Sequence, residues 1–198
     1  MKYLKKPIST ILRSPNTVFT FKDIFLMWGD TEATTVKSGV HYYVKTGGLY
    51  RIRKGIYAKD KKYNKFELAT KIFTPSYISF ETVLAQAGII FQFYGQIFAA
   101  SYLTREITCD HQTYSYRKIK DPLLTNHAGI ERRDAVTIAS PERAFLDVVY
   151  LNTDYHFDNL ANLNWDRVFE ILPIYGGNKR MEKKVGLYHE ADKKSAAR

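Results

Sequence analysis

The sequence predicts an α+β protein. Between residues 20 and 46 the apolar residues recur at helical spacing, and after Gly47-Gly48 the pattern changes to the alternation that is typical of a strand. Between residues 66 and 172, helical patterns are interrupted by short runs rich in β-branched and aromatic residues. We therefore expect an N-terminal unit of helices and a hairpin, followed by a mixed α/β domain with a small antiparallel sheet.

A first amphipathic helix is predicted to begin at Thr20. Thr20 can act as the N-cap, and Asp23 stands at the third helical position, where its carboxylate can bond back to the cap. Ahead of this helix, Pro7 can occupy the first turn of a short helix that ends at Ser14-Pro15. The apolar face of the helix after Thr20 consists of Phe21, Ile24, Phe25 and Trp28.

A second helix is expected over residues 31–46, after a break at Gly29 and with Asp30 as its cap. Its apolar stripe consists of Val36, Val40, Tyr43 and Val44. The opposite face can donate to phosphates and base edges. It contains no carboxylate, which would repel the phosphates, so the pattern is typical of a helix that lies in the major groove. The residues of this face are Thr34, Thr35, Lys37, Ser38, His41, Tyr42 and Lys45.

A basic hairpin is predicted directly after the second helix. Tyr50 and Ile52 face one side of its first strand, and Arg51 and Arg53 face the other. Lys54-Gly55 is a tight-turn dipeptide, and the return strand follows it. Its cations suit a wing that rests on the DNA backbone or in the minor groove. Helix, turn, helix and basic hairpin together predict a winged helix-turn-helix.

Positive charge is concentrated in the same part of the chain. Residues 1–62 contain 13 Lys and Arg against 4 Asp and Glu, a net charge of +9, whereas the remaining residues contain 17 against 16, a net charge of +1. This segregation is expected of an electrostatic footprint for nucleic acid. We therefore expect double-stranded DNA as a partner.

The chain is expected to contain three segments. Residues 1–62 form the winged helix-turn-helix, residues 63–175 form the α+β domain, and residues 176–198 form a basic helical tail. In the tail, a helix is expected over residues 178–187, with frayed residues after it.

Two helix starts are predicted in the α+β domain. Ser140 can cap a helix that has proline at its first position, and on this helix Asp147 is expected to pair with Arg143, one turn earlier. Ser79 is expected to cap another helix.

Composition argues against several other classes. Cys109 is the only cysteine, so the chain cannot form an internal disulfide, and we expect a reducing compartment. The five histidines lack metal-ligand spacing, and neither a metal nor another cofactor is expected. The sequence shows no signal peptide and no run of about 18 apolar residues. We expect a cytoplasmic protein without a membrane partner.

An enzyme is the main alternative. A nuclease-like domain needs carboxylates that converge on Mg²⁺, and the sequence alone cannot register the strands that carry them. A serine nucleophile would need flanking glycines that are missing here. We therefore expect no enzyme. The candidate metal ligands are Glu106, Asp110 and Glu131, and the candidate triad is Ser140, His127 and Asp147.

A third interpretation is an interaction module whose basic first third binds RNA or an acidic protein. Such a module binds without sequence preference, whereas a repressor prefers its site by about 10³-fold or more.

Two segments of the middle domain resemble a known family. They are YISFETVLAQAGII, residues 77–90, and IASPERAFLDVVYL, residues 138–151, behind a hairpin that ends in GLYRIRKGIYAK. In this order they resemble the AbiEi-type antitoxins, transcriptional regulators of bacterial type IV toxin-antitoxin and phage-abortive systems, over residues 20–151.

The resemblance implies a function for each domain. The N-terminal domain would bind inverted repeats in its own promoter and repress it, while the C-terminal domain would oppose a nucleotidyltransferase toxin encoded next door. Because a palindromic site requires two copies, we expect a monomer or a dimer on DNA. The chain is shorter than many such antitoxins.

Overall fold

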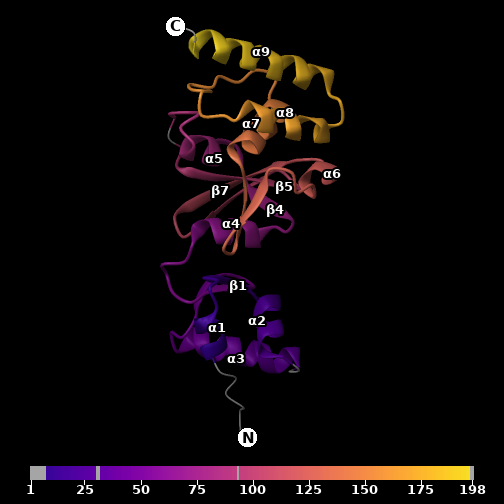
Figure 1. The fold of residues 1–198 in the computed structure, drawn as a ribbon. Coiled ribbons are helices and arrows are strands. Elements are labelled where there is room, and N and C mark those ends of the chain that lie inside the picture. Colours follow the sequence, from indigo (N-terminus) through magenta and orange to yellow (C-terminus); the bar gives the residue numbers. More distant parts are fainter. Residues whose placement is uncertain (1–7, 30–31, 93, 197–198) are drawn as a thin grey trace, which may run out of the picture.

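The computed structural model describes residues 8–29, 32–92 and 94–196, and it confirms an α+β fold (Figure 1). The two parts of the chain are stacked along one axis, with the N-terminal part at one end and the C-terminal helix at the other (Figure 1). The predicted roles of Pro7 in a first turn and of Asp30 as a helix cap lie outside the described residues.

The N-terminal part combines short helices with a three-stranded antiparallel sheet. The helix Phe21–Trp28 begins as predicted. The Thr20 hydroxyl accepts from the Asp23 amide, and the Asp23 carboxylate accepts from the Thr20 amide. The strand order is β1-β3-β2. The elements are α1 Ser9–Arg13, β1 Val18–Thr20, α2 Phe21–Trp28, α3 Ala33–Lys45, β2 Tyr50–Arg53 and β3 Ile56–Ala58.

A small core holds the N-terminal part together. Ile24 and Trp28 of α2 pack with Val36 and Val40 of α3, as the two apolar stripes predicted. Phe19 of β1 completes this core. The sequence did not reveal β1, since three residues are too few to show an alternation.

The second part is built on a six-stranded mixed sheet, so the small antiparallel sheet predicted for this domain was wrong. The strand order is β6-β7-β5-β4-β9-β8. β5 runs parallel to β7 and β4 runs parallel to β9, while the other neighbours are antiparallel. Parallel neighbours require long crossover connections, which a local alternation pattern does not encode. The strands are β4 Ser76–Ile78, β5 Gln96–Ser101, β6 Arg105–Cys109, β7 Gln112–Lys118, β8 Ile130–Arg133 and β9 Val136–Ala139.

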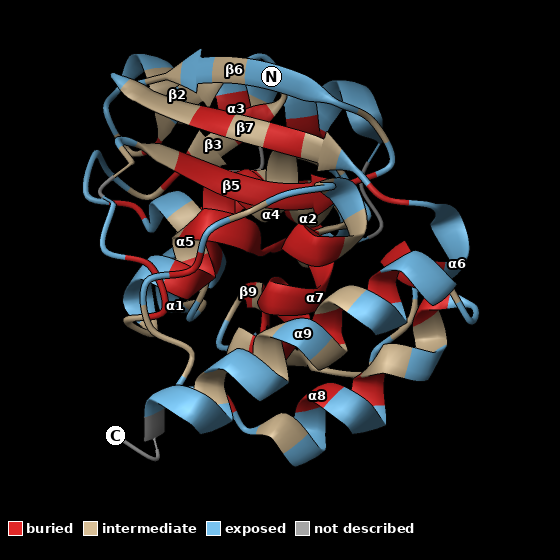
Figure 2. Ribbon diagram, turned by 90° about the horizontal axis from the view of Figure 1, so that it is seen from above, coloured by how far each residue is buried: buried red, intermediate tan, exposed pale blue. Residues whose placement is uncertain are grey.

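Helices cover both faces of this sheet, with α4 on the side of the N-terminal part and α5 and α7 on the other side (Figure 1). β5 is buried over almost its whole length, whereas the edge strand β6 is largely exposed (Figure 2). The helices are α4 Lys65–Ile72, α5 Phe80–Gln86, α6 Asp121–Leu124, α7 Pro141–Leu151, α8 Trp165–Ile171, the 3-10 helix η1 Leu172–Tyr175 and α9 Lys179–Ala196.

The two predicted helix starts differ in outcome. Ser140 caps α7, since its hydroxyl accepts from the Arg143 amide at 3.3 Å. Ser79 directly precedes α5 but makes no cap, because its hydroxyl donates instead to the buried Asp147 carboxylate at 2.8 Å. The hydroxyl thus binds a distant carboxylate acceptor and makes no bond with a local amide donor.

The prediction that the last helix frays beyond residue 187 was wrong, because α9 continues to Ala196. Tyr188 donates to the Tyr155 carbonyl at 2.6 Å, and the Asp192 carboxylate accepts from the indole of Trp165 at 2.8 Å. These tertiary contacts stabilise turns whose own apolar content is low.

Candidate nucleic-acid interface

The seven polar residues predicted on the outer face of α3 are all exposed. On the opposite side of the helix, Val36 and Val40 are buried in the small core. Among the described elements, α3 lies at the end of the molecule that is farthest from α9 (Figure 1). The structure thus presents on one open surface Thr34, Thr35, Lys37, Ser38, His41, Tyr42 and Lys45.

Local contacts constrain part of this face. The Ser38 hydroxyl donates to the Thr34 carbonyl at 3.0 Å. The ring of Tyr42 meets the ring of Tyr43 edge to face, with centroids 5.3 Å apart. Within the described residues, Lys37 and Lys45 form no ion pair, so their ammonium groups can serve an external anion.

Glu32 is the acid next to this face, and the sequence interpretation did not consider it. It is the exposed N-cap residue of α3, and its carboxylate accepts from the Thr34 hydroxyl at 3.4 Å. A negative charge at this position interacts favourably with the helix dipole. It would nevertheless oppose a phosphate placed at the start of the helix.

The hairpin forms as predicted, with Gly55 at φ 80° in its turn. Arg51 and Lys54 are exposed, as a wing requires. The pairing with β3 shifts register between Arg51 and Arg53, and this irregularity disturbs the alternation of side chains.

Arg53 is placed differently from the other nine predicted contact residues. It is half-buried, and its Nη1 atom is buried without a hydrogen-bond partner among the described residues. Burial raises the pKa of the Cys109 thiol on β6, and the nearby Arg53 guanidinium opposes that rise. Arg53 therefore faces the second part of the molecule. Of the three hairpin cations predicted to contact DNA, the structure exposes only Arg51 and Lys54.

The carboxylates considered for a nuclease do not converge. Glu106 lies on β6 and Glu131 on β8, which are the opposite edges of the six-stranded sheet. Asp110 is bound by two tyrosine hydroxyls. Across the described residues, the structure contains no group of three or more His, Cys, Asp or Glu side chains that could hold a metal ion.

The residues considered for a triad have other partners. The Ser140 hydroxyl caps α7. Asp147 is completely buried and, as predicted, pairs with Arg143. His127 is exposed.

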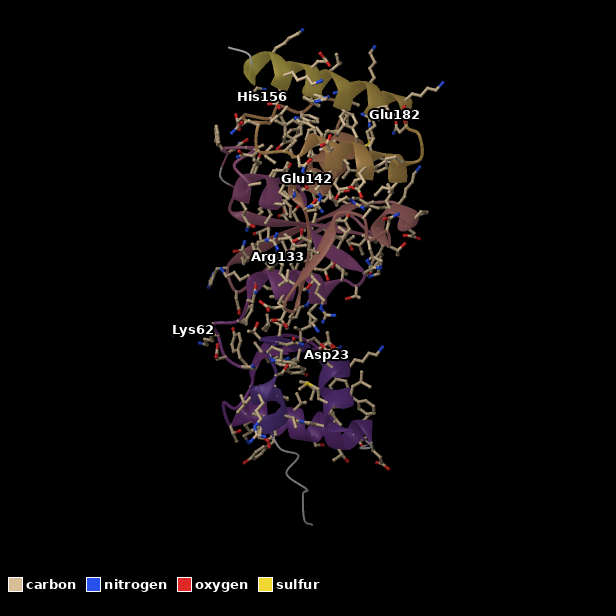
Figure 3. The ribbon with its side chains drawn as sticks, in the orientation of Figure 1. Asp23, Lys62, Arg133, Glu142, His156 and Glu182 are labelled. Carbon is tan, nitrogen blue, oxygen red and sulfur yellow. The ribbon has the colours of Figure 1, made fainter. Side chains whose placement is uncertain are left out.

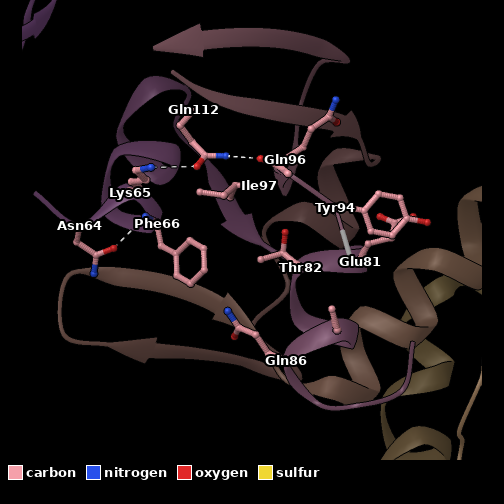
Figure 4. A pocket seen from close by; sticks show the side chains of 12 residues that line it. Asn64, Lys65, Phe66, Glu81, Thr82, Gln86, Tyr94, Gln96, Ile97 and Gln112 are labelled. Carbon is pink, nitrogen blue, oxygen red and sulfur yellow. Dashed lines mark hydrogen bonds between the residues drawn. The ribbon is translucent and has the colours of Figure 1, made fainter. Parts of the chain in front are cut away.

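A cavity of ≈ 450 Å³ lies between the start of α4, α5 and the start of β5 (Figure 4). Several of its polar side chains bond to protein groups. Lys65 donates to the side-chain oxygen of Gln112 at 3.2 Å, and the side-chain amide of Gln112 donates to the main-chain carbonyl of Gly95 at 2.8 Å. Glu81 pairs with Arg117 at 2.9 Å, and its second oxygen is buried without a hydrogen-bond partner among the described residues. Lys65, Gln112 and one oxygen of Glu81 are thus already engaged by protein groups.

The basic tail contributes little to a continuous anion-binding surface. Arg180 donates to the carbonyls of Tyr150 and Asn152 at the C-terminus of α7, where its charge complements the helix dipole. Lys183 is exposed, and so is the acid that precedes it in the sequence, Glu182, which lies at the α9 end of the molecule (Figure 3). α9 also lies at the far end of the molecule from α3 (Figure 1).

Comparison with known proteins leaves the chain unassigned: no protein-family model matches it, and no curated protein matches it either. In the part of the chain that the structure describes, no helix has the length and apolar character needed to cross a membrane.

Proposed function

We propose that this protein is a sequence-specific DNA-binding transcriptional repressor of the antitoxin type. In this proposal α2 and α3 act as a helix-turn-helix, α3 lies in the major groove, and the hairpin of β2 and β3 is the wing. The observation that carries the proposal is the outer face of α3, where seven polar side chains are exposed and no carboxylate occurs within the helix.

The dimensions of α3 support this proposal. Its 13 residues span about 20 Å at the rise of an α-helix. The major groove of B-DNA is about 12 Å wide and admits one helix. Lys37 and His41 are one turn apart on the exposed face, so both can reach base edges, while Thr34 and Ser38 can reach the backbone.

The position of the hairpin also supports the proposal. Arg51 and Lys54 are exposed on the strand and turn that follow α3. A phosphate beside the reader helix would meet both cations, and such contacts set the register of a protein on DNA without reading sequence. The net charge of +9 in residues 1–62 adds long-range attraction.

The antitoxin role is proposed from the resemblance of the middle segments. Residues 77–90 contain most of β4 and all of α5, and residues 138–151 contain the end of β9 and all of α7. In the structure β4 pairs with β9 and α5 packs on α7, so the two segments form one unit at the centre of the second domain. We propose that this domain opposes a nucleotidyltransferase toxin encoded by the neighbouring gene.

The DNA-binding proposal is tested by titration of the purified full-length chain. The probes are a labelled duplex from directly upstream of its coding sequence and an unrelated duplex of equal length, at two salt concentrations. Preference for the upstream duplex by about 10³-fold supports a repressor. Equal, strongly salt-dependent binding to both would overturn sequence specificity and favour the RNA or acidic-partner interpretation.

The antitoxin role has a separate test. The neighbouring gene is expressed alone and together with this chain, and growth is recorded. Protection by the chain supports the role, and undiminished toxicity contradicts it. A variant without Lys37 and His41 separates repression from protection, since only repression should require the reader helix.

A further inference from the structure

One carboxylate of the second domain accepts hydrogen bonds from two tyrosines. One tyrosine belongs to the N-terminal part and the other to the linker. Asp110, in the turn between β6 and β7, accepts a hydrogen bond from the Tyr50 hydroxyl at 2.9 Å and another from the Tyr63 hydroxyl at 2.9 Å. Tyr50 is the first residue of β2, and Tyr63 belongs to the segment that joins the two parts. Their rings are stacked, with centroids 6.4 Å apart.

The turn that carries Asp110 is sharply bent. Asp110 has φ 47° and His111 has φ 61°, so two consecutive residues adopt the left-handed conformation. This is the geometry of a tight two-residue hairpin turn, which projects its side chains beyond the ends of the strands. The last pair of the β6–β7 ladder is Cys109 with Gln112. Asp110 therefore stands at the tip, where it can reach β2.

Other polar contacts between the two parts lie outside the strand β2. The Glu67 carboxylate of α4 accepts from the Thr17 amide at 2.8 Å and from the Thr17 hydroxyl at 2.6 Å. Lys71 of α4 pairs with Asp23, at the start of α2, at 2.7 Å. Figure 3 shows Asp23 at the level where the two parts meet. These contacts lie ahead of β2. On β2 itself, Tyr50 adds a side-chain hydrogen bond to Asp110, beside the pairing with β3 and the packing of Tyr50 and Ile52 on the core of the second domain.

The three-stranded sheet is a layer shared by the two parts. Val18, Ile56 and Ala58 belong to the core of the second domain, and Phe19 belongs to the small N-terminal core. Because neighbouring residues of a strand point to opposite faces, the side of β2 that bears Tyr50 meets the second domain and Arg51 points away from it. The bond between Tyr50 and Asp110 therefore acts on the residue directly before Arg51 in β2.

We propose that Asp110 is a positioning residue for the wing: by holding Tyr50 it fixes Arg51 and Lys54 against the DNA backbone, and the second domain thereby sets the affinity for DNA. This inference rests on the proposed DNA-binding function. If Asp110 has this role, a change in the second domain that moves the β6–β7 turn alters repression.

The test compares full-length variants at Asp110 with a matched control at Asp134. Asp110→Gly removes both hydrogen bonds without strain, because glycine tolerates a positive φ. Asp134→Gly is the matched control: Asp134 is exposed and has φ 54° in the turn between β8 and β9. Within the described part of the chain, it accepts from Arg132 through its main-chain carbonyl and forms no ion pair. Asp110→Asn keeps one of the two acceptor oxygens, so its loss of DNA affinity should be smaller than that of Asp110→Gly.

The probe is the duplex from directly upstream of the coding sequence. Asp110→Gly should weaken binding by about threefold to tenfold and flatten the salt dependence by about one to two charges. The control should bind as the parent does. When Arg51→Ala is already present, Asp110→Gly should have a smaller effect, because the two changes remove the same contact. An undiminished effect would overturn the inference.

Hydrogen exchange of the β2 amides, measured without DNA, distinguishes a failure of the Asp110 positioning role from a failure of the DNA-binding proposal. Asp110→Gly should accelerate exchange in β2 and leave α3 unchanged. If β2 loosens and DNA affinity stays the same, the positioning role is overturned while DNA binding stands. If the parent protein does not prefer the upstream duplex, the proposed function fails instead, and faster exchange would still report the contact between Asp110 and Tyr50. Unchanged exchange would overturn the inference directly.

Discussion

Arg143 and Asp147 form an ion pair at the centre of the second domain, with Arg143 Nε 3.2 Å from Asp147 Oδ1 and both side chains 0% exposed. The Asp147 carboxylate also accepts from the hydroxyls of Tyr77, Ser79 and Tyr175. The Arg143 guanidinium donates further to main-chain carbonyls, including that of Leu123 at 2.7 Å. One pair thus joins α7 to β4, to η1 and to the end of α6.

Loss of one member of this pair should strongly destabilise the protein. Asp147→Ala leaves a buried guanidinium unpaired, which typically costs about 3–5 kcal/mol of unfolding free energy. Urea denaturation followed by circular dichroism measures this cost. Glu131→Ala is the control, because Glu131 and Arg133 form an exposed pair that is expected to contribute at most about 1 kcal/mol. Equal losses in the two variants would contradict the central role of the buried pair.

The buried tyrosines predict a loss of stability in alkali. Burial raises the pKa of Tyr77 and of Tyr175 well above the ordinary value of 10.0. Above about pH 10 the unfolded chain loses these phenolic protons while the folded chain keeps them, so stability falls as pH rises, by up to about 1.4 kcal/mol per pH unit for each tyrosine. Urea midpoints measured from about pH 9 upward test this. Tyr77→Phe should make the decline shallower, and a decline of the same slope would contradict it.

Substitutions on α3 and on the wing should have different effects on DNA binding. Lys37→Ala or His41→Ala should reduce the preference for the upstream duplex by about 1–3 kcal/mol, because these side chains are placed to read bases. Lys54→Ala should weaken binding to all duplexes similarly and reduce the salt slope by about one charge. Lys183→Ala, an exposed lysine on the distant α9, is the control. Equal, modest losses at both sites would refute this division of roles.

Substitution of Arg53 should change the reactivity of Cys109 more than the affinity for DNA. Because its guanidinium opposes the rise in the pKa of Cys109, Arg53→Ala should raise that pKa further and slow the reaction of the thiol with a thiol-specific reagent at constant pH. The salt slope of DNA binding should change less than in Lys54→Ala. Arg51→Ala is the control for thiol reactivity, since Arg51 is exposed. A fall in the salt slope of DNA binding with unchanged thiol reactivity would instead indicate that Arg53 contacts the DNA backbone.

Glu32→Gln should strengthen DNA binding. Glu32 lies at the start of the proposed reader helix, and its charge opposes a phosphate there. The neutral amide keeps a hydrogen-bond acceptor for Thr34. The expected change is about threefold at low salt and less at high salt. Weaker binding would show that the acid supports the helix more than it repels DNA.

The sequence by itself determined the local features of the N-terminal part. The capping box of Thr20 and Asp23, the apolar stripe of α3 and the turn at Gly55 all depend on residues a few positions apart. A periodic pattern fixes which face of a helix packs inward, and the exposed face of α3 follows from that alone. The pair of Arg143 and Asp147 was predictable for the same reason, since four residues separate them on one helix.

Only the tertiary structure decided the long-range features. The Ser79 hydroxyl does not cap α5 but bonds to Asp147, 68 positions away in the sequence. Tyr50 bonds to Asp110, 60 positions away. The parallel pairing of β5 with β7 and the register shift that turns Arg53 from the wing also lie outside any local pattern. The physical reason is the same in each case: a hydrogen bond or strand pair forms with whichever group the folded chain brings near, and sequence spacing encodes only neighbours.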